Sequence, residues 1–188
     1  TVVEEGIFNE TDHGANMEAV KFTSTVTDAS IAWIGEGRAY ANTYTSPVVL
    51  GQVMTTTEDP DAPGEFPFSV FWAQGPRPSD PPSADALKVG KHVGQDPDQT
   101  RADEPIGYIV IESGSGTIDG HSFVAGVGAD KVVGSNVNPV TYSLAGPDDA
   151  ATAIVSAAAM DGADGGWPVL AGATPVTATG LKLFFEED

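Results

Sequence analysis

Short runs of β-branched and aromatic residues recur along the whole chain, separated by Gly, Pro, Asp and Asn. Runs of this length and composition are typical of strands in antiparallel sheets, because branched and aromatic side chains pack well on a pleated surface. The strands predicted in this way are 1–5, 19–27, 30–34, 38–45, 48–56, 67–73, 106–112, 122–125, 140–144, 151–158, 168–170 and 179–185. The pattern predicts an all-β protein built from antiparallel β-sandwich modules of Greek-key or jelly-roll type.

Residues 75–105 interrupt this pattern with repeated Pro and Asp. Proline has no backbone N–H to donate to a sheet and fixes its own φ angle, so the segment is predicted as a long excursion outside the sheets. Residues 84–91 within it are compatible with a short turn of helix. The segment is either a linker near residue 100 or a loop that lies over one sandwich.

The two halves of the chain resemble each other in three places. Residues 2–6 resemble 110–114, residues 46–54 resemble 152–160, and residues 68–72 resemble 181–185. Such an internal echo is how repeated modules are recognised. It predicts two related sandwich modules, 1–100 with the loop 75–105 and 101–188, with a single merged domain as the alternative.

The charge balance is strongly acidic, with 27 Asp and Glu against 8 Lys and Arg and a formal net charge of −19. Such a chain repels nucleic acid phosphates and anionic membranes, so neither is expected as a partner. Hydrophobic residues make up 40% of the sequence, which is enough for a folded core. No stretch approaches the roughly 20 apolar residues of a membrane-spanning helix.

The absence of cysteine excludes disulfides, thiolate metal ligands and cysteine nucleophiles. The chain opens on Thr1 rather than Met, which predicts a processed polypeptide. Together with the abundance of Thr, Gly, Asp and Ala and the scarcity of Lys, these features predict an extracellular or cell-surface protein.

Two acidic loops that contain glycine are candidate calcium sites. Asp161 and Asp164 stand among glycines in one, and Asp59 and Asp61 occupy the equivalent place in the first half. Calcium takes several oxygen ligands from a flexible loop, and glycine permits the sharp turns that this needs. Neither loop has the spacing of an EF-hand, so an Asp-Gly turn between strands is the alternative interpretation. A further oxygen cluster consists of Asp96, Asp98, Asp103 and Glu104.

Tryptophan supplies the candidate ligand-binding residue. Trp167 stands beside Pro168 in an acidic, Gly-rich segment, where its ring could stack on a sugar. A place in the sandwich core is the alternative, and it is the one expected for Trp72. The three histidines are scattered, and no serine lies in a nucleophile elbow. The sequence therefore gives no positive indication of an enzyme.

One further resemblance rests on short motifs. Residues 47–50, 68–72 and 104–112 resemble the strand series of H-type lectin-like β-sandwich modules, and 160–167 with 181–186 resemble segments of large repetitive surface proteins of marine microbes. The resemblance implies a β-sandwich at the cell surface, and in some members binding of galactose-type sugars. It transfers no sugar-contacting residue to this chain.

These observations lead to three hypotheses about function. The first is a structural or adhesive building block that assembles head to tail, in which Val2 and Val3 complete the edge of a neighbouring copy and Leu183 and Phe185 belong to the strand that accepts them. Calcium would support this assembly. The second hypothesis is a carbohydrate-binding module, and the third is a polysaccharide-active enzyme.

Overall fold

The structure is a computed structural model that describes residues 3–55, 68–132, 134, 139–143, 152–160, 162 and 165–187. Within these ranges it consists almost entirely of β-strands in several sheets, which confirms the predicted all-β class. In chain order the elements are β1 (Gly6–Phe8), α1 (Glu10–His13), β2 (Met17–Ser24), β3 (Thr27–Asp28), β4 (Glu36–Arg38), β5 (Pro47–Val53), β6 (Val70–Gln74), β7 (Leu87–His92), β8 (Glu104–Glu112), β9 (Gly114–Ile118), β10 (His121–Ala125), β11 (Val140–Ser143), β12 (Gly166–Leu170), β13 (Val176–Thr177) and β14 (Gly180–Glu187).

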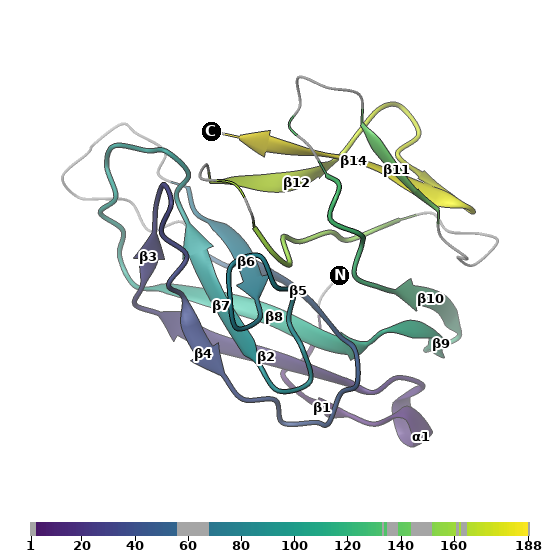
Figure 1. Cartoon of the computed structure of the whole chain (residues 1–188). Coiled ribbons are helices and arrows are strands. Elements are labelled where there is room, and N and C mark those ends of the chain that lie inside the picture. Colours follow the sequence, from purple (N-terminus) through teal and green to yellow (C-terminus); the bar gives the residue numbers. More distant parts are fainter. Residues whose placement is uncertain are drawn as a thin grey trace.

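Two sheets face each other to form a sandwich (Figure 1). The first sheet has the order β1-β2-β8-β5 and is antiparallel throughout. The second sheet is centred on β7, which pairs antiparallel with β4 and β6 and parallel with β3. The sandwich therefore contains strands from residue 6 through residue 112 in one pair of layers.

The core of this sandwich lies between the two sheets. Val49, Ile106 and Val110 project into it from the first sheet, and Phe71 and Val89 from the second. Every second residue of β8 is buried, as the period of two along a strand requires. Burying aliphatic and aromatic side chains of this size contributes about 1.5–3 kcal/mol each, so this cluster supplies much of the stability of the fold.

A third sheet lies beyond the sandwich (Figure 1). Its central strand is β14, which pairs with β11 on one edge and with β12 and β13 on the other. A separate hairpin of β9 and β10 continues directly from β8. The sequence predicted strands close to most of these elements but missed β9 and β13.

The predicted excursion at 75–105 is wrong at its centre, because Leu87–His92 forms β7, the central strand of the second sheet. The prolines at 76, 78, 81 and 82 lie in the connection before this strand, so they flank it without interrupting it. The predicted helical turn at 84–91 is absent for the same reason. The strand was missed because Lys91 and His92 are polar residues of the kind expected at the surface, whereas both are buried in β7.

The proposed division into modules at residue 100 is also not supported by the sheet topology. Strand β8 belongs to the second proposed module, yet it pairs along its length with β2 and β5 of the first. A boundary between residues 100 and 101 would cut through one four-stranded sheet. The internal echo does not match the strands either, since residues 3–5 and 152–156 are irregular and 152–160 contains a single bridge, at Ala157.

Strand β14 is not the open edge that the assembly hypothesis requires. Leu181–Leu183 pair with β11 on one side and with β12 and β13 on the other. Farther along, Phe185 is bridged to Gly134 on the side opposite β12. The prediction that this strand accepts the first strand of another copy is therefore wrong, because residues 180–185 are already paired on both sides.

The one helix in the part of the chain that the structure describes is α1, with four residues. None of the described helices is long and apolar enough to cross a bilayer.

Candidate functional site

The outer face of the third sheet carries a set of apolar side chains whose position follows from strand alternation. Val169 of β12 is the cross-strand partner of Phe184 in β14, so both side chains lie on the same face. Trp167 is two residues from Val169 and shares that face. Phe68, which precedes β6, packs edge-on against Trp167 with ring centroids 5.3 Å apart. We call Phe68, Trp167, Val169 and Phe184 the aromatic face.

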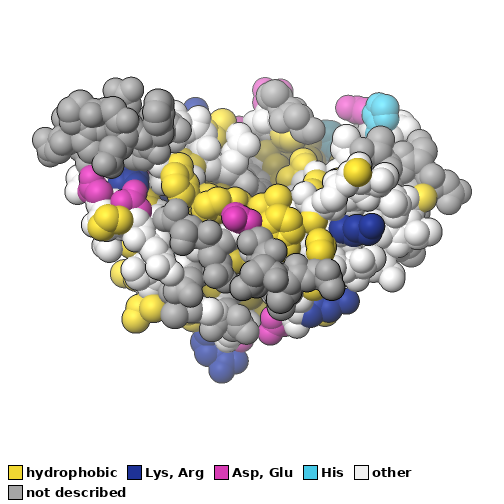
Figure 2. All heavy atoms as spheres, turned by 90° about the horizontal axis from the view of Figure 1, so that it is seen from above, with side chains coloured by type: hydrophobic (Ala, Val, Ile, Leu, Met, Phe, Trp, Pro, Cys, Tyr) yellow, Lys and Arg dark blue, Asp and Glu magenta, His cyan; other side chains and the backbone are white. Residues whose placement is uncertain are grey.

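These side chains are accessible from outside the molecule. Phe68 is 37% exposed, and the other three are partly exposed. Figure 2, which views the molecule from the side of the third sheet, shows hydrophobic side chains gathered in a band with acidic and basic side chains beside them. Lys182 and Glu186 of β14 are on the same face, because they alternate in step with Phe184. The face is thus an apolar strip with charged neighbours.

The opposite face of the third sheet is turned toward the sandwich. Leu183 is buried, and Phe185 packs against a cluster that contains Trp33 and Trp72. Phe184 and Phe185 therefore serve different purposes although they are adjacent in sequence. The first faces solvent, and the second fixes the third sheet to the sandwich.

The four residues predicted to act in assembly do not form one surface. Val3 is exposed in an irregular segment before β1, and Val2 lies outside the described residues. Leu183 and Phe185 both point toward the interior of the molecule.

The predicted calcium ligands Asp59, Asp61, Asp161 and Asp164 all lie outside the described residues. Among the residues that the structure does describe, no group of three or more His, Asp and Glu side chains is arranged to hold a metal ion. Calcium binding by these loops stays a prediction.

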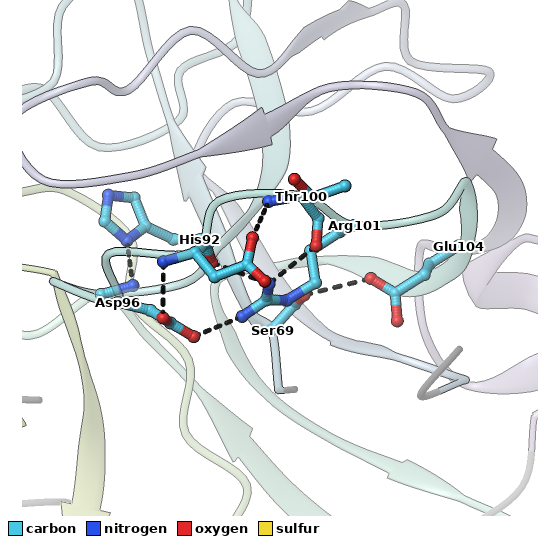
Figure 3. Close-up of polar contacts among 8 residues, drawn as sticks. Ser69, His92, Asp96, Thr100, Arg101 and Glu104 are labelled. Carbon is cyan, nitrogen blue, oxygen red and sulfur yellow. Dashed lines mark hydrogen bonds and ion pairs between the residues drawn. The ribbon is translucent and has the colours of Figure 1, made fainter. Parts of the chain in front are cut away.

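The acidic cluster around Asp96 already holds a cation from its own chain (Figure 3). The buried guanidinium of Arg101 donates to the Asp96 carboxylate at 2.6 Å and to the backbone carbonyls of Asp98 and Thr100 at 2.8 Å. The Asp96 and Asp98 carboxylates accept the backbone N–H groups of Asp98 and Thr100. Arg101 thus neutralises Asp96, one of the four carboxylates of the predicted oxygen cluster.

A second buried cation stands nearby in β7. The Lys91 ammonium lies 3.0 Å from the Glu104 carboxylate and donates to the Ala102 carbonyl at 2.6 Å. Ser69 donates to the same Glu104 oxygen at 3.0 Å (Figure 3). Lys91 and Glu104 are 0% and 2% exposed, so the pair is removed from water. It joins β7 of the second sheet to the start of β8 in the first.

His92, the next residue of β7, is enclosed in an aromatic environment. Its ring stacks on Trp33 with centroids 4.0 Å apart, and its Nδ1 accepts the Gly94 N–H at 2.8 Å. Its Nε2 makes no hydrogen bond of good geometry with any described residue. Burial lowers the pKa of His92, and the nearby carbonyls of Ser30 and Ala32 offset this only in part. The ring is therefore a neutral structural group and is not accessible to a ligand.

Asp28 is a second buried titratable group of the same region. Burial raises its pKa, while hydrogen bonds from the Ile34 and Gly35 N–H groups lower it in part. These two bonds fix the turn that carries Trp33. The carboxylate is 1% exposed, so we assign it to the fold and not to ligand binding.

We expect acid to destabilise the protein through His92. The folded pKa is lowered, so the unfolded chain binds more protons just below the ordinary histidine pKa of 6.5, and stability falls as the pH falls from that value. The raised pKa of Asp28 acts in the opposite direction, because its contribution is lost as the pH rises. Urea unfolding between pH 7 and 5 should give a steeper loss for the wild type than for His92→Asn, by at most about 1.4 kcal/mol per pH unit.

The exposed His121 provides the control for this experiment. His121→Asn should leave the pH dependence of the wild type unchanged. Parallel curves for the wild type and His92→Asn would show that His92 does not set the acid sensitivity.

A groove of about 1840 Å³ separates the outer face of the first sheet from the inner face of the third. Its wall on the first sheet is apolar and includes Val48, Leu50, Ile109 and Ile111. The carboxylates that line it, from Glu4, Asp12, Asp119 and Asp130, come from segments outside these two strands. Apolar packing surface therefore dominates this part of the molecule.

Sequence reasoning found one residue of the aromatic face and missed the rest. Trp167 was predicted to bind ligand, and it does lie on an accessible surface. Phe184 could have been found, because its strand places Leu181, Leu183 and Phe185 on one face and therefore Phe184 on the other. Phe68 could not, since its contact with Trp167 joins segments about a hundred residues apart.

Comparisons of this chain with protein-family models, with curated proteins and with solved structures found no match.

Proposed function

We propose that this chain is a carbohydrate-binding module of an extracellular, adhesive protein, and that it holds a polysaccharide against the aromatic face. The observation that carries the proposal is the grouping of Phe68, Trp167 and Phe184 on the outside of one sheet. The C–H bonds on one side of a pyranose ring form an apolar patch with slight positive charge. Such a patch packs well against the electron-rich face of an aromatic ring.

The net charge of −19 restricts the kind of polysaccharide. A chain that carries carboxylates or sulfates would be repelled by the field of the whole molecule. An uncharged glucan or galactan is not repelled in this way. Lys182 and Glu186 stand beside the aromatic rings, where they can donate to and accept from sugar hydroxyl groups. An uncharged polysaccharide therefore fits this surface better than an acidic one.

An exposed apolar strip on a soluble domain also needs an explanation of its own. Contiguous exposed apolar patches usually mark interaction sites. The inner side of the same sheet packs against the sandwich, whereas Phe184 and Trp167 on the outer side stay partly exposed among the described residues. This contrast supports an external ligand.

Loss of Trp167 should remove most of the binding. Affinity electrophoresis in gels that contain a neutral β-glucan or galactan should retard the wild type. The retardation of Trp167→Ala should correspond to an affinity at least about tenfold lower, as expected when a central aromatic anchor is removed. Phe184→Ala should act in the same direction. Circular dichroism should show both variants folded, because both side chains are partly exposed.

Ile31 offers a matched control, since it is an apolar side chain that is 74% exposed outside the third sheet. Ile31→Ala should bind like the wild type. An alginate gel tests the charge argument and should retard none of these proteins. Equal retardation of Trp167→Ala and the wild type in every neutral gel would rule out the aromatic face as the site.

A further inference from the structure

The outer side of the third sheet extends beyond the aromatic face. Lys182 of β14 lies two residues from Phe184 and is therefore on the same side of the strand. The direct cross-strand partner of Lys182 is Thr141 of β11, so these two side chains share that side as well. Both are exposed. The outer side of this sheet is thus aromatic toward the C-terminal end of β14 and polar toward its N-terminal end.

The register of the three strands places Trp167, Phe184 and Thr141 on one straight diagonal across β14. Trp167 of β12 is paired with Glu186, so Phe184 is its diagonal neighbour. Thr141 is paired with Lys182, so Phe184 is its diagonal neighbour too, from the other side of β14. Diagonal neighbours are about 7–8 Å apart, so the line from Trp167 to Thr141 is about 15 Å long. We call Trp167, Phe184 and Thr141 the diagonal line.

A charged side chain stands beside each end of the diagonal line. Glu186 is the direct partner of Trp167, and Lys182 is the direct partner of Thr141. Glu186 and Lys182 are four residues apart in one strand, about 14 Å at 3.4 Å per residue, which is too far for an ion pair. Lys182 forms no ion pair with any carboxylate of the described residues, although the chain has 27 Asp and Glu. Its three N–H donors therefore remain for a ligand.

The shape of this surface favours a long ligand over a short one. None of the side chains on the diagonal line or beside its ends lines the groove between the sheets. A concave pocket encloses most of a small ligand, whereas the outer side of a sheet contacts only one side of each sugar ring. A single ring covers one of the three positions, and its few contacts leave little net affinity after the cost of immobilising it. A chain of linked sugars makes all the contacts together.

We propose, resting on the carbohydrate-binding function above, that the ligand is the interior of a linear neutral polysaccharide that crosses β14 along the diagonal line. Neighbouring parts of the chain stack on Trp167 and Phe184. The part beyond them accepts hydrogen bonds from Lys182 and shares one with the hydroxyl of Thr141. A monosaccharide or disaccharide does not reach both ends of the line and binds weakly.

Chain length provides the first test. Titrations followed by NMR chemical shifts give dissociation constants for oligosaccharides of two to six residues, prepared from the neutral β-glucan or galactan that retards the wild type. The disaccharide occupies the two aromatic rings, and the longer chains add the contacts with Lys182 and Thr141. The affinity should therefore rise by at least about tenfold from the disaccharide to the tetrasaccharide and change little beyond the length that spans the line.

Thr141→Val and Lys182→Met test the polar end of the line directly. Each substitution removes hydrogen-bonding groups and keeps the apolar part of the side chain. Each should weaken binding of the hexasaccharide by about two- to tenfold and leave that of the disaccharide unchanged. Trp167→Ala should weaken both. Thr23→Val and Lys21→Met, at exposed positions of β2, are the matched controls and should change neither.

The possible failures are distinguishable. Equal affinities of the wild type for the disaccharide and the hexasaccharide would refute the diagonal line and leave the aromatic face as a site for one or two sugars. Wild-type affinity for the hexasaccharide in both Thr141→Val and Lys182→Met would refute it as well. If no neutral polymer retards the wild type, or if Trp167→Ala is retarded equally, the carbohydrate-binding function itself is wrong and the diagonal line falls with it.

Discussion

Lys91→Met should lower the free energy of unfolding by about 3–5 kcal/mol. The substitution removes the ammonium from a pair in which both residues are almost completely buried, and it leaves the Glu104 carboxylate in the interior without a cation. An uncompensated buried charge costs far more than the pair contributes. Urea unfolding at pH 7, followed by circular dichroism, measures the effect.

A double variant tests whether the charge itself is the cause. Lys91→Met combined with Glu104→Leu removes both charges, and buried ion pairs replaced by apolar residues are often neutral in stability. The double variant should therefore be more stable than Lys91→Met alone. Lys21→Met is the matched control, because Lys21 is exposed in β2, and it should change the stability by less than about 0.5 kcal/mol. If Lys91→Met is as stable as the double variant or more stable, the unpaired Glu104 charge is not the cause of the loss.

This ion pair also explains where prediction from the sequence failed. The run Leu87–His92 contains two lysines and a histidine, and prolines surround it, so its composition suggested a loop. It becomes a central strand because Lys91 meets Glu104 and His92 stacks on Trp33. Glu104 and Trp33 lie outside β7 in other segments of the chain, so the sequence of β7 alone does not identify them as its partners. In β5 and in residues 106–112 of β8, where the buried side chains are hydrophobic, alternation and branching predicted the strands closely.

The candidate site shows the same division between local and long-range information. Residues 179–185 were predicted as a strand, and the period of two then separates Phe184 from Phe185. The neighbours of that strand do not follow from its sequence. It was predicted to be an edge and is central, because pairing with β11 and β12 depends on where distant segments fold back. The prediction that β14 accepts a strand of another copy required an open edge and failed. The accessible position of Trp167 follows from the alternation of its own strand.

Trp72→Ala should cost about 3–5 kcal/mol of unfolding free energy, the usual range for a fully buried aromatic residue. The Trp72 side chain is 1% exposed and packs at right angles to Trp33 with centroids 5.6 Å apart. Gly90 lies directly against its ring, and a Cβ at that position would come within 2.6 Å of Trp72. The backbone is therefore shaped around this side chain, and small movements cannot fill the cavity that alanine would leave.

The destabilisation caused by Trp72→Ala should extend beyond the sandwich, because Trp72 contacts three parts of the molecule. It belongs to β6, packs against Ala157 and Met160 of the segment 152–160, and shares this cluster with Phe185 of the third sheet. Hydrogen exchange of Trp72→Ala should show less protection in β14 and at Ala73, whose N–H donates to the Ala157 carbonyl. Trp167→Ala, at the accessible tryptophan, should leave both regions protected. Loss of protection confined to β6 would mean that the third sheet is held mainly by contacts other than this cluster.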